Sequence, residues 1–83
     1  MRLTKPIVAR QEREEIHKLS DLIEVAGSRA DLAVWDVSGV RYEWAKGARR
    51  LVVLAGFERR AIELSEPTKL AAKKAVFAEV REL

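Results

Sequence analysis

The sequence contains no cysteine and only one histidine, and these shortages exclude several classes of protein. Without cysteine the chain can form neither a disulfide framework nor a thiolate metal site, so packing alone must hold its core. A single histidine, with no run of alternating acidic residues of the kind found in calcium loops, leaves no ligand set for a metal ion. We therefore predict a protein without a metal or another cofactor.

Long apolar runs and glycine-rich loops are also missing. The longest apolar run, Leu51-Val-Val-Leu-Ala55, is far shorter than the roughly 20 residues that span a bilayer. The first residues lack the apolar core of a signal peptide. The absence of cysteine agrees with a reducing compartment, so we interpret the chain as a cytoplasmic protein that does not contact a membrane. The four glycines are isolated, and no phosphate-binding loop is expected.

No group of residues indicates catalysis. His17 precedes Asp21 by one helical turn, and this carboxylate could orient the imidazole, but neither a nucleophile nor a cleft accompanies them. The serines fall at helix, cap and turn positions rather than at a nucleophile elbow. We therefore predict a non-enzymatic protein. Its 83 residues, 48% of them apolar, suit one small domain spanning residues 1–83.

The net charge of +3 is unevenly distributed along the chain. Residues 1–40 carry six Lys or Arg against seven Asp or Glu, whereas residues 41–83 carry ten against six. The basic surplus lies mostly in the doublets Arg49-Arg50, Arg59-Arg60 and Lys73-Lys74. A basic half of this kind can attract phosphate, although the same balance is ordinary for a soluble protein surface.

Two segments show helical periodicity. In residues 10–26 the apolar side chains recur at helical spacing, and Gly27 follows as a C-cap. Residues 69–82 are rich in helix formers and follow the start signal Ser65-Glu66-Pro67-Thr68. Residues 1–9 are predicted to form an extended arm. The predicted apolar stripe of the second helix contains Leu70, Val76, Phe77, Val80 and Leu83.

Residues between these helices predict a β-meander, because glycines punctuate them regularly and apolar residues alternate with polar ones. A two-residue turn at Ser38-Gly39 places Trp35 opposite Tyr42 and Ala33 opposite Trp44, which makes one face apolar. On the other face this register pairs Asp36 with Arg41. A second two-residue turn at Lys46-Gly47 predicts Tyr42 opposite Leu51, Glu43 opposite Arg50 and Val40 opposite Val53.

A fourth strand over residues 57–64 is expected at the edge of the sheet, where its charges discourage unwanted pairing. The predicted fold is thus an α+β two-layer sandwich, αβββ(β)α. Its antiparallel meander of three to four strands is flanked in sequence by an N-terminal and a C-terminal helix, and both helices pack on the aromatic face. Any pocket should open at one end of that face.

The order helix, three strands, helix is similar to that of double-stranded RNA-binding domains. That family also places lysines at the start of its last helix, as Lys69-Leu-Ala-Ala72-Lys73 does here. The resemblance implies binding to duplex RNA. The hairpins of this chain are tight, however, and the longer loop that reaches the RNA minor groove in that family has no counterpart.

The face of the sheet opposite the aromatic residues is the first candidate site. It combines aliphatic residues with charges of both signs, a mixture typical of an interface. We therefore predict a small regulator, adaptor or inhibitor that binds another protein, with a homodimer as one form of that contact. The candidate interface residues are Leu32, Val34, Asp36, Arg41, Glu43, Arg50, Val52 and Leu54.

The alternative function is nucleic-acid binding through the basic second half of the chain. Lys69 and Lys73 would lie beside the unpaired N–H groups at a helix N-terminus, a good setting for phosphate. Acidic residues interspersed among the arginines count against this alternative. Its candidate residues are Arg49, Arg59, Arg60, Lys69, Lys73 and Lys74.

Overall fold

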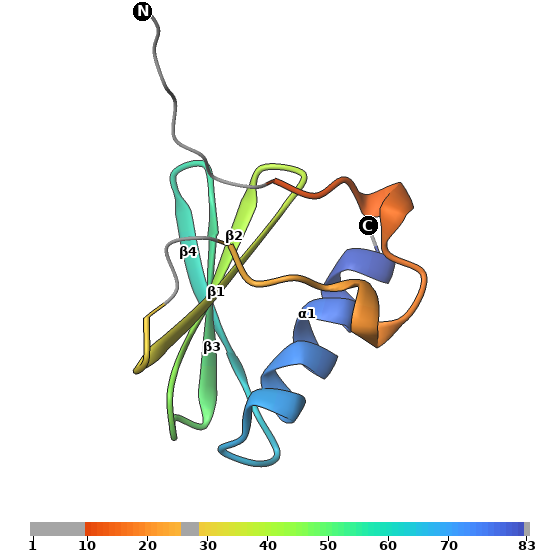
Figure 1. Cartoon of the computed structure of the whole chain (residues 1–83). Helices are drawn as coiled ribbons and strands as arrows, with labels where there is room; N and C mark the ends of the chain where they lie inside the picture. Colours follow the sequence, from red (N-terminus) through yellow and green to blue (C-terminus); the bar gives the residue numbers. More distant parts are fainter. Residues whose placement is uncertain (1–9, 26–28, 83) are drawn as a thin grey trace, which may run out of the picture.

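The computed structural model describes residues 10–25 and 29–82. The predicted arm over residues 1–9 and the predicted helix end at Gly27 lie outside this part of the chain. Four antiparallel strands form one sheet in the order β1-β2-β3-β4, and α1 packs across one of its faces (Figure 1). The α+β class, the meander and the C-terminal helix are therefore confirmed. The elements are η1 (Arg13–Glu15), η2 (Leu19–Asp21), β1 (Leu32–Val37), β2 (Val40–Ala45), β3 (Arg50–Ala55), β4 (Glu58–Glu63) and α1 (Lys69–Glu82).

The first hairpin has the predicted register. Trp35 lies opposite Tyr42, and Ala33 opposite Trp44, while Asp36 lies opposite Arg41 on the other face. The turn requires positive φ at both central residues, and these are Ser38 at +51° and Gly39 at +85°. This hairpin was predictable because turn geometry and side-chain alternation specify the same register.

The predicted register of the second hairpin is wrong by two residues. Tyr42 lies opposite Val53 rather than Leu51, because residues 46–49 form a four-residue loop instead of a two-residue turn. The wider loop places the Ala48 carbonyl 2.8 Å from Nε1 of Trp44, which donates a hydrogen bond to it. The loop therefore satisfies a buried indole N–H. A shift of two residues keeps every side chain on its predicted face.

β4 occupies the edge of the sheet, as predicted, and spans residues 58–63 rather than 57–64. It follows β3 through the two-residue turn Gly56-Phe57. Gly56 has φ of +63°, the conformation that the first central residue of a type II′ turn requires. Phe57, at the tip of this hairpin, is fully exposed.

Helix α1 has the predicted bounds, and its first turn is capped by Thr68. The Thr68 hydroxyl accepts a hydrogen bond from the Ala71 N–H at 3.1 Å. The buried stripe differs from the prediction at its start, because Leu70 is 55% exposed. The row that faces the sheet consists of Ala72, Val76 and Val80, spaced four residues apart. Alanine at the first of these positions lets the start of the helix approach the sheet closely.

The N-terminal helix predicted over residues 10–26 is the main error. Residues 10–25 instead form the single turns η1 and η2 joined by extended backbone. Gln11 explains the difference, because its N–H donates to Asp36 O at 2.9 Å and its carbonyl accepts from Ser38 N–H at 2.6 Å. Farther along, the Val25 N–H donates to Val34 O at 2.8 Å. Backbone N–H and C=O groups that a helix would use for its own hydrogen bonds are thus bonded to β1. Pairing with a distant strand therefore overrides the helical periodicity of the sequence.

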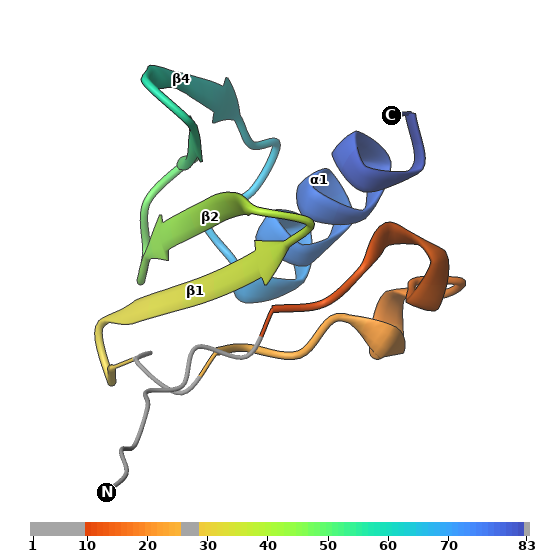
Figure 2. The same ribbon diagram turned by 90° about the horizontal axis from the view of Figure 1, so that it is seen from above.

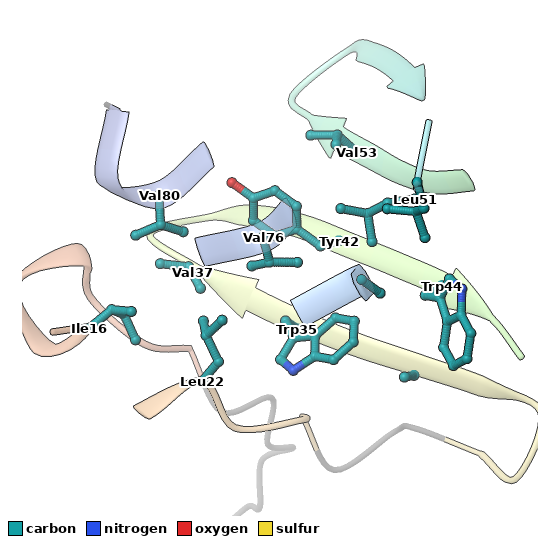
Figure 3. Packing of buried hydrophobic residues seen from close by; sticks show 13 residues of the cluster. Ile16, Leu22, Trp35, Val37, Tyr42, Trp44, Leu51, Val53, Val76 and Val80 are labelled. Atoms are coloured by element: carbon teal, nitrogen blue, oxygen red, sulfur yellow. The ribbon is translucent and has the colours of Figure 1, made fainter. Parts of the chain in front are cut away.

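The loss of this helix also removes the helix–strands–helix order on which the similarity to double-stranded RNA-binding domains depends. The segment still contributes to the core, because Ile16 and Leu22 are buried against the aromatic face (Figure 3). Ile23, by contrast, is 62% exposed. The apolar spacing of the segment thus identified core residues but not the backbone conformation that carries them.

The core lies between the aromatic face of the sheet, α1 and residues 10–25 (Figures 2 and 3). Trp35, Tyr42 and Trp44 supply its bulk, and all three are at most 3% exposed. Burial raises the pKa of the Tyr42 hydroxyl, and the negative charge of Glu79 raises it further. No side chain on the opposite face of the sheet contributes to this cluster.

We predict that Val76→Ala lowers the free energy of unfolding by about 2 kcal/mol, because it leaves a cavity beneath the aromatic residues. Leu70→Ala is the matched control on the same helix and should change it by less than about 0.5 kcal/mol. Urea unfolding followed by tryptophan fluorescence measures both values. Equal losses of unfolding free energy in the two variants would contradict the observation that Val76 is buried and Leu70 is exposed.

A second prediction concerns Asp21, whose Oδ2 accepts the backbone N–H groups of His17 at 2.8 Å and Lys18 at 3.0 Å. The His17 N–H is the main cause that lowers the pKa of this carboxyl below 3.8. Because the folded-state pKa is lowered, the stabilisation is complete above the ordinary carboxyl pKa and disappears as the pH falls through the folded-state pKa.

NMR titration should therefore show the amide signals of His17 and Lys18 moving together with a midpoint below 3.8. Asp21→Asn should remove this transition while the β1–β2 hairpin signals stay unchanged. A midpoint at or above the ordinary carboxyl value would show that these hydrogen bonds are not formed in solution.

Candidate functional site

The two faces of the sheet have different surroundings. Helix α1 and residues 10–25 lie on the same side of the sheet, over the aromatic face (Figure 2). Within the described ranges 10–25 and 29–82, no helix covers the opposite side, which we call the open face. The first candidate site predicted from the sequence lies on this face.

Strand register arranges the open face in cross-strand rows. The central row contains Val34, Glu43, Val52 and Ala61, and the next row contains Asp36, Arg41, Leu54 and Arg59. The structure thus brings the predicted interface residues of three strands together, and it adds three residues from β4. The sequence prediction missed Ala61 and Glu63, and it assigned Arg59 only to the nucleic-acid site. A register for the fourth strand would have found all three, since Gly56-Phe57 specifies it.

The predicted aliphatic residues of the open face differ in accessibility. Leu32, Val52 and Leu54 are partly exposed, but Val34 is 0% exposed. Val34 lies beside Val25, which is also buried and donates its N–H to Val34 O. The aliphatic surface that a partner could touch is therefore centred on Val52 and Leu54, with Leu32 nearer to the edge.

Charged groups surround this aliphatic centre. Nε of Arg41 lies 2.7 Å from Oε2 of Glu43, and Nε of Arg10 lies 3.8 Å from Oδ1 of Asp36. The Arg41–Glu43 pair is exposed enough to contribute little to stability, whereas the Asp36 carboxylate is mostly buried. The effect of such ion pairs at a surface is mainly on specificity, since a partner has to present complementary charges in a matching arrangement.

A hollow of about 300 Å³ lies at the β3–β4 end of the open face, where the small Ala61 side chain leaves space. Arg50 and Arg59 line it, and their side chains make no hydrogen bond or ion pair with any described residue. Arg60 also lines it, but its Nη2 is engaged 2.6 Å from Oε1 of Glu79 on α1. The hollow therefore offers two unpaired guanidinium groups, a suitable environment for a carboxylate.

The six predicted nucleic-acid residues do not form one group of free cations. Arg49 donates to the Ser65 carbonyl at 3.1 Å, and Arg60 is paired with Glu79. Nζ of Lys69, proposed to hold phosphate at the helix start, lies 2.5 Å from Oε2 of Glu24. The three that have no partner among the described residues are Arg59, Lys73 and Lys74.

A pocket of about 210 Å³ opens at one end of the aromatic face, as expected there. Ala33 and Trp44 form its apolar wall, and the Lys69–Glu24 ion pair lies at its rim. The volume is below the roughly 300 Å³ at which typical small-molecule sites begin. The Trp44 N–H is already used by Ala48, so the pocket lacks a free donor at this indole.

Across residues 10–25 and 29–82, no three His, Cys, Asp or Glu side chains converge in a way that could hold a metal ion. Over those ranges no helix has both the length and the apolar character to cross a membrane. Asp21, considered above as a partner for the His17 ring, instead accepts the backbone N–H of His17.

The unequal burial on the open face yields a prediction. Val34→Asp should lower the free energy of unfolding by about 3 kcal/mol or more, because it places an unpaired charge in a fully buried position. Leu54→Asp should lower it by less than about 1 kcal/mol, because position 54 is partly exposed between Arg41 and Arg59. Thermal unfolding by circular dichroism compares the two variants. Similar losses would show that the open face is also core.

Comparison with known proteins returned no match to this chain among family models, curated proteins or solved structures.

Proposed function

We propose that this chain is a small, non-enzymatic binding protein that acts by protein–protein contact through the open face, as a regulator, adaptor or inhibitor of a larger assembly. The observation that carries the proposal is the one-sided covering of the sheet. Helix α1 and residues 16 and 22 pack on the aromatic face, and on the open face the burial is confined to Val34 beside Val25, while Val52 and Leu54 stay partly exposed. An apolar centre at Val52 and Leu54 with a charged surround has the anatomy of an interface.

The size of the open face favours a reversible contact. Each strand has six residues, so the four-stranded face measures about 20 Å by 15 Å. A standard stable interface buries about 800 Å² on each partner, which exceeds what a face of this size supplies. Reversible binding suits a regulator or adaptor, whose partner has to be released.

Nucleic-acid binding remains the alternative function, and it has weaker support. A phosphate-binding surface requires several cations that are free to move toward the backbone of a nucleic acid. Arg49, Arg60 and Lys69 are each held by an oxygen of the chain itself. Arg59 lies on β4, whereas Lys73 and Lys74 lie on α1, so the free cations belong to different elements.

The experiment that tests the proposal compares partner capture by the wild-type protein with capture by Leu54→Asp. The matched control is Leu70→Asp, which makes the same chemical change at an exposed position of α1 outside the open face. A specific partner should bind the wild type and the control but lose roughly tenfold or more in affinity for Leu54→Asp. Quantitative mass spectrometry identifies such a protein, and titration calorimetry with the purified partner gives its affinities.

A partner that binds all three forms equally would place the contact elsewhere on the molecule. Fluorescence anisotropy with mixed-sequence duplex RNA and DNA, at about 50 and 200 mM salt, tests the alternative. Micromolar binding that weakens at least about tenfold between these salt concentrations would favour nucleic acid as the partner. In that case Lys73→Glu should reduce binding, and Leu54→Asp should leave it unchanged.

A further inference from the structure

The two edges of the sheet differ in how their backbone groups are satisfied. Along the outer edge of β1, Gln11 donates to Asp36 O, Val25 donates to Val34 O, and Arg29 exchanges hydrogen bonds with Leu32. The outer edge of β4 receives no backbone hydrogen bond from any residue in the ranges 10–25 and 29–82. An open strand edge is a template for pairing with another chain.

The pairing of β4 with β3 determines which groups its outer edge presents. Beyond the end of β4, the Leu64 N–H donates to Arg49 O at 2.9 Å, so these two residues form a hydrogen-bonded pair. Such pairs alternate along an antiparallel ladder, and Glu58, Arg60 and Ile62 therefore direct their backbone groups toward β3. The residues that direct N–H and C=O outward are Arg59, Ala61 and Glu63, all of them exposed.

These three residues are self-complementary. A two-fold axis perpendicular to the sheet at Ala61 would pair β4 with the β4 of a second copy in antiparallel orientation. Ala61 would then face Ala61, and Arg59 of each copy would face Glu63 of the other. Both charge pairs would lie on the open face. Neighbouring registers lose these two charge pairs. A two-fold axis at Arg60 would place Arg60 opposite Arg60, and an axis at Ile62 would place Ala61 opposite Glu63.

The hollow at Ala61 and the tip of the hairpin fit the same arrangement. The unpaired Arg59 that lines the hollow would receive the Glu63 carboxylate of the other copy. Phe57, fully exposed at the hairpin tip, would lie beside Ser65 of the other copy. The charges that discourage pairing with an arbitrary strand thus favour one partner in one register.

We propose that β4 is the edge through which two copies of this chain join their four-stranded sheets into one continuous sheet. The occupant of the open edge is a second β4, held by backbone hydrogen bonds and two Arg59–Glu63 pairs. This inference goes beyond the proposed function, because it concerns pairing between two copies at the β4 edge rather than binding of a different protein at Val52 and Leu54, although Arg59 and Glu63 lie at the β4 side of the open face. Dimerisation and partner binding can each occur without the other.

Sedimentation velocity over about 1 to 500 μM tests the dimer with charge-reversal variants of the full chain. The wild-type protein should sediment as a concentration-dependent dimer. Arg59→Glu and Glu63→Arg, each alone, should raise the dimer dissociation constant roughly tenfold or more, because like charges then face each other twice. An equimolar mixture of the two variants should restore dimers, since both pairings are again between opposite charges. Lys74→Glu, an equal charge change on α1, should sediment like the wild type.

Ala61→Pro provides a second, independent disruption. It removes an outward N–H that the β3–β4 ladder does not use, so the fold should persist by circular dichroism while the dimer is lost. This variant also separates loss of pairing from misfolding, because Glu63→Arg places two arginines opposite each other within one chain. A monomeric wild type throughout the concentration range would overturn the proposal. So would dimers that tolerate the single variants, or folded single variants that fail to associate when mixed.

Discussion

The pairing of Trp35 with Tyr42 and of Ala33 with Trp44 is the constraint on which the rest of the structure depends. Because side chains alternate across a strand, this register collects the large aromatic groups on one face and sends the intervening residues to the other. An aromatic face of this size has to be removed from water, and α1 and residues 10–25 both do so. No other helix or strand in the described ranges is available to cover the open face. The exposure of Val52 and Leu54, on which the proposed function depends, is therefore a consequence of how the core is built.

The N-terminal segment shows a second consequence of the same constraint. To place Ile16 and Leu22 over the aromatic face, residues 10–25 have to pass the outer edge of β1, where Gln11 and Val25 bond to the strand. One edge of the sheet is thereby satisfied within the chain. The arginine pair Arg13 and Arg81 reinforces this path, since Arg13 donates to Val80 O and Arg81 donates to Ile16 O. The segment therefore serves both the core and the edge, which leaves β4 as the edge without such a neighbour among the described residues.

Local signals predicted much of this fold, and long-range contacts account for the errors. The first hairpin, the bounds of α1 and the edge position of β4 depend on turn residues, caps and alternation, which act over a few positions. The absent N-terminal helix depends on bonds between Gln11 and β1, and no local pattern reveals a partner so distant in the sequence. The four-residue loop after β2 depends on the Trp44 N–H reaching Ala48. The residues that β1, β2 and β3 contribute to the open face were predicted correctly despite this loop, because a shift of two residues preserves the face. The burial of Val34 and the ion pairs of Lys69 and Arg60 required the tertiary structure.

The geometry of the two proposed surfaces makes them compatible. Edge pairing at β4 uses backbone groups in the plane of the sheet, whereas partner binding on the open face uses side chains perpendicular to it. If two copies join at β4, the two-fold axis perpendicular to the sheet places both open faces on the same side of the continuous sheet. A partner with two matching sites, or an assembly with repeated sites, could then bind both open faces of the dimer at once, each through a weak contact. The second contact becomes intramolecular, which raises the overall affinity without any new interaction in either face. An open face that is too small for stable binding by one copy would then be large enough for stable binding by a dimer. Because the dimer forms only at sufficient protein concentration, the affinity for the partner would depend on the concentration of the chain itself.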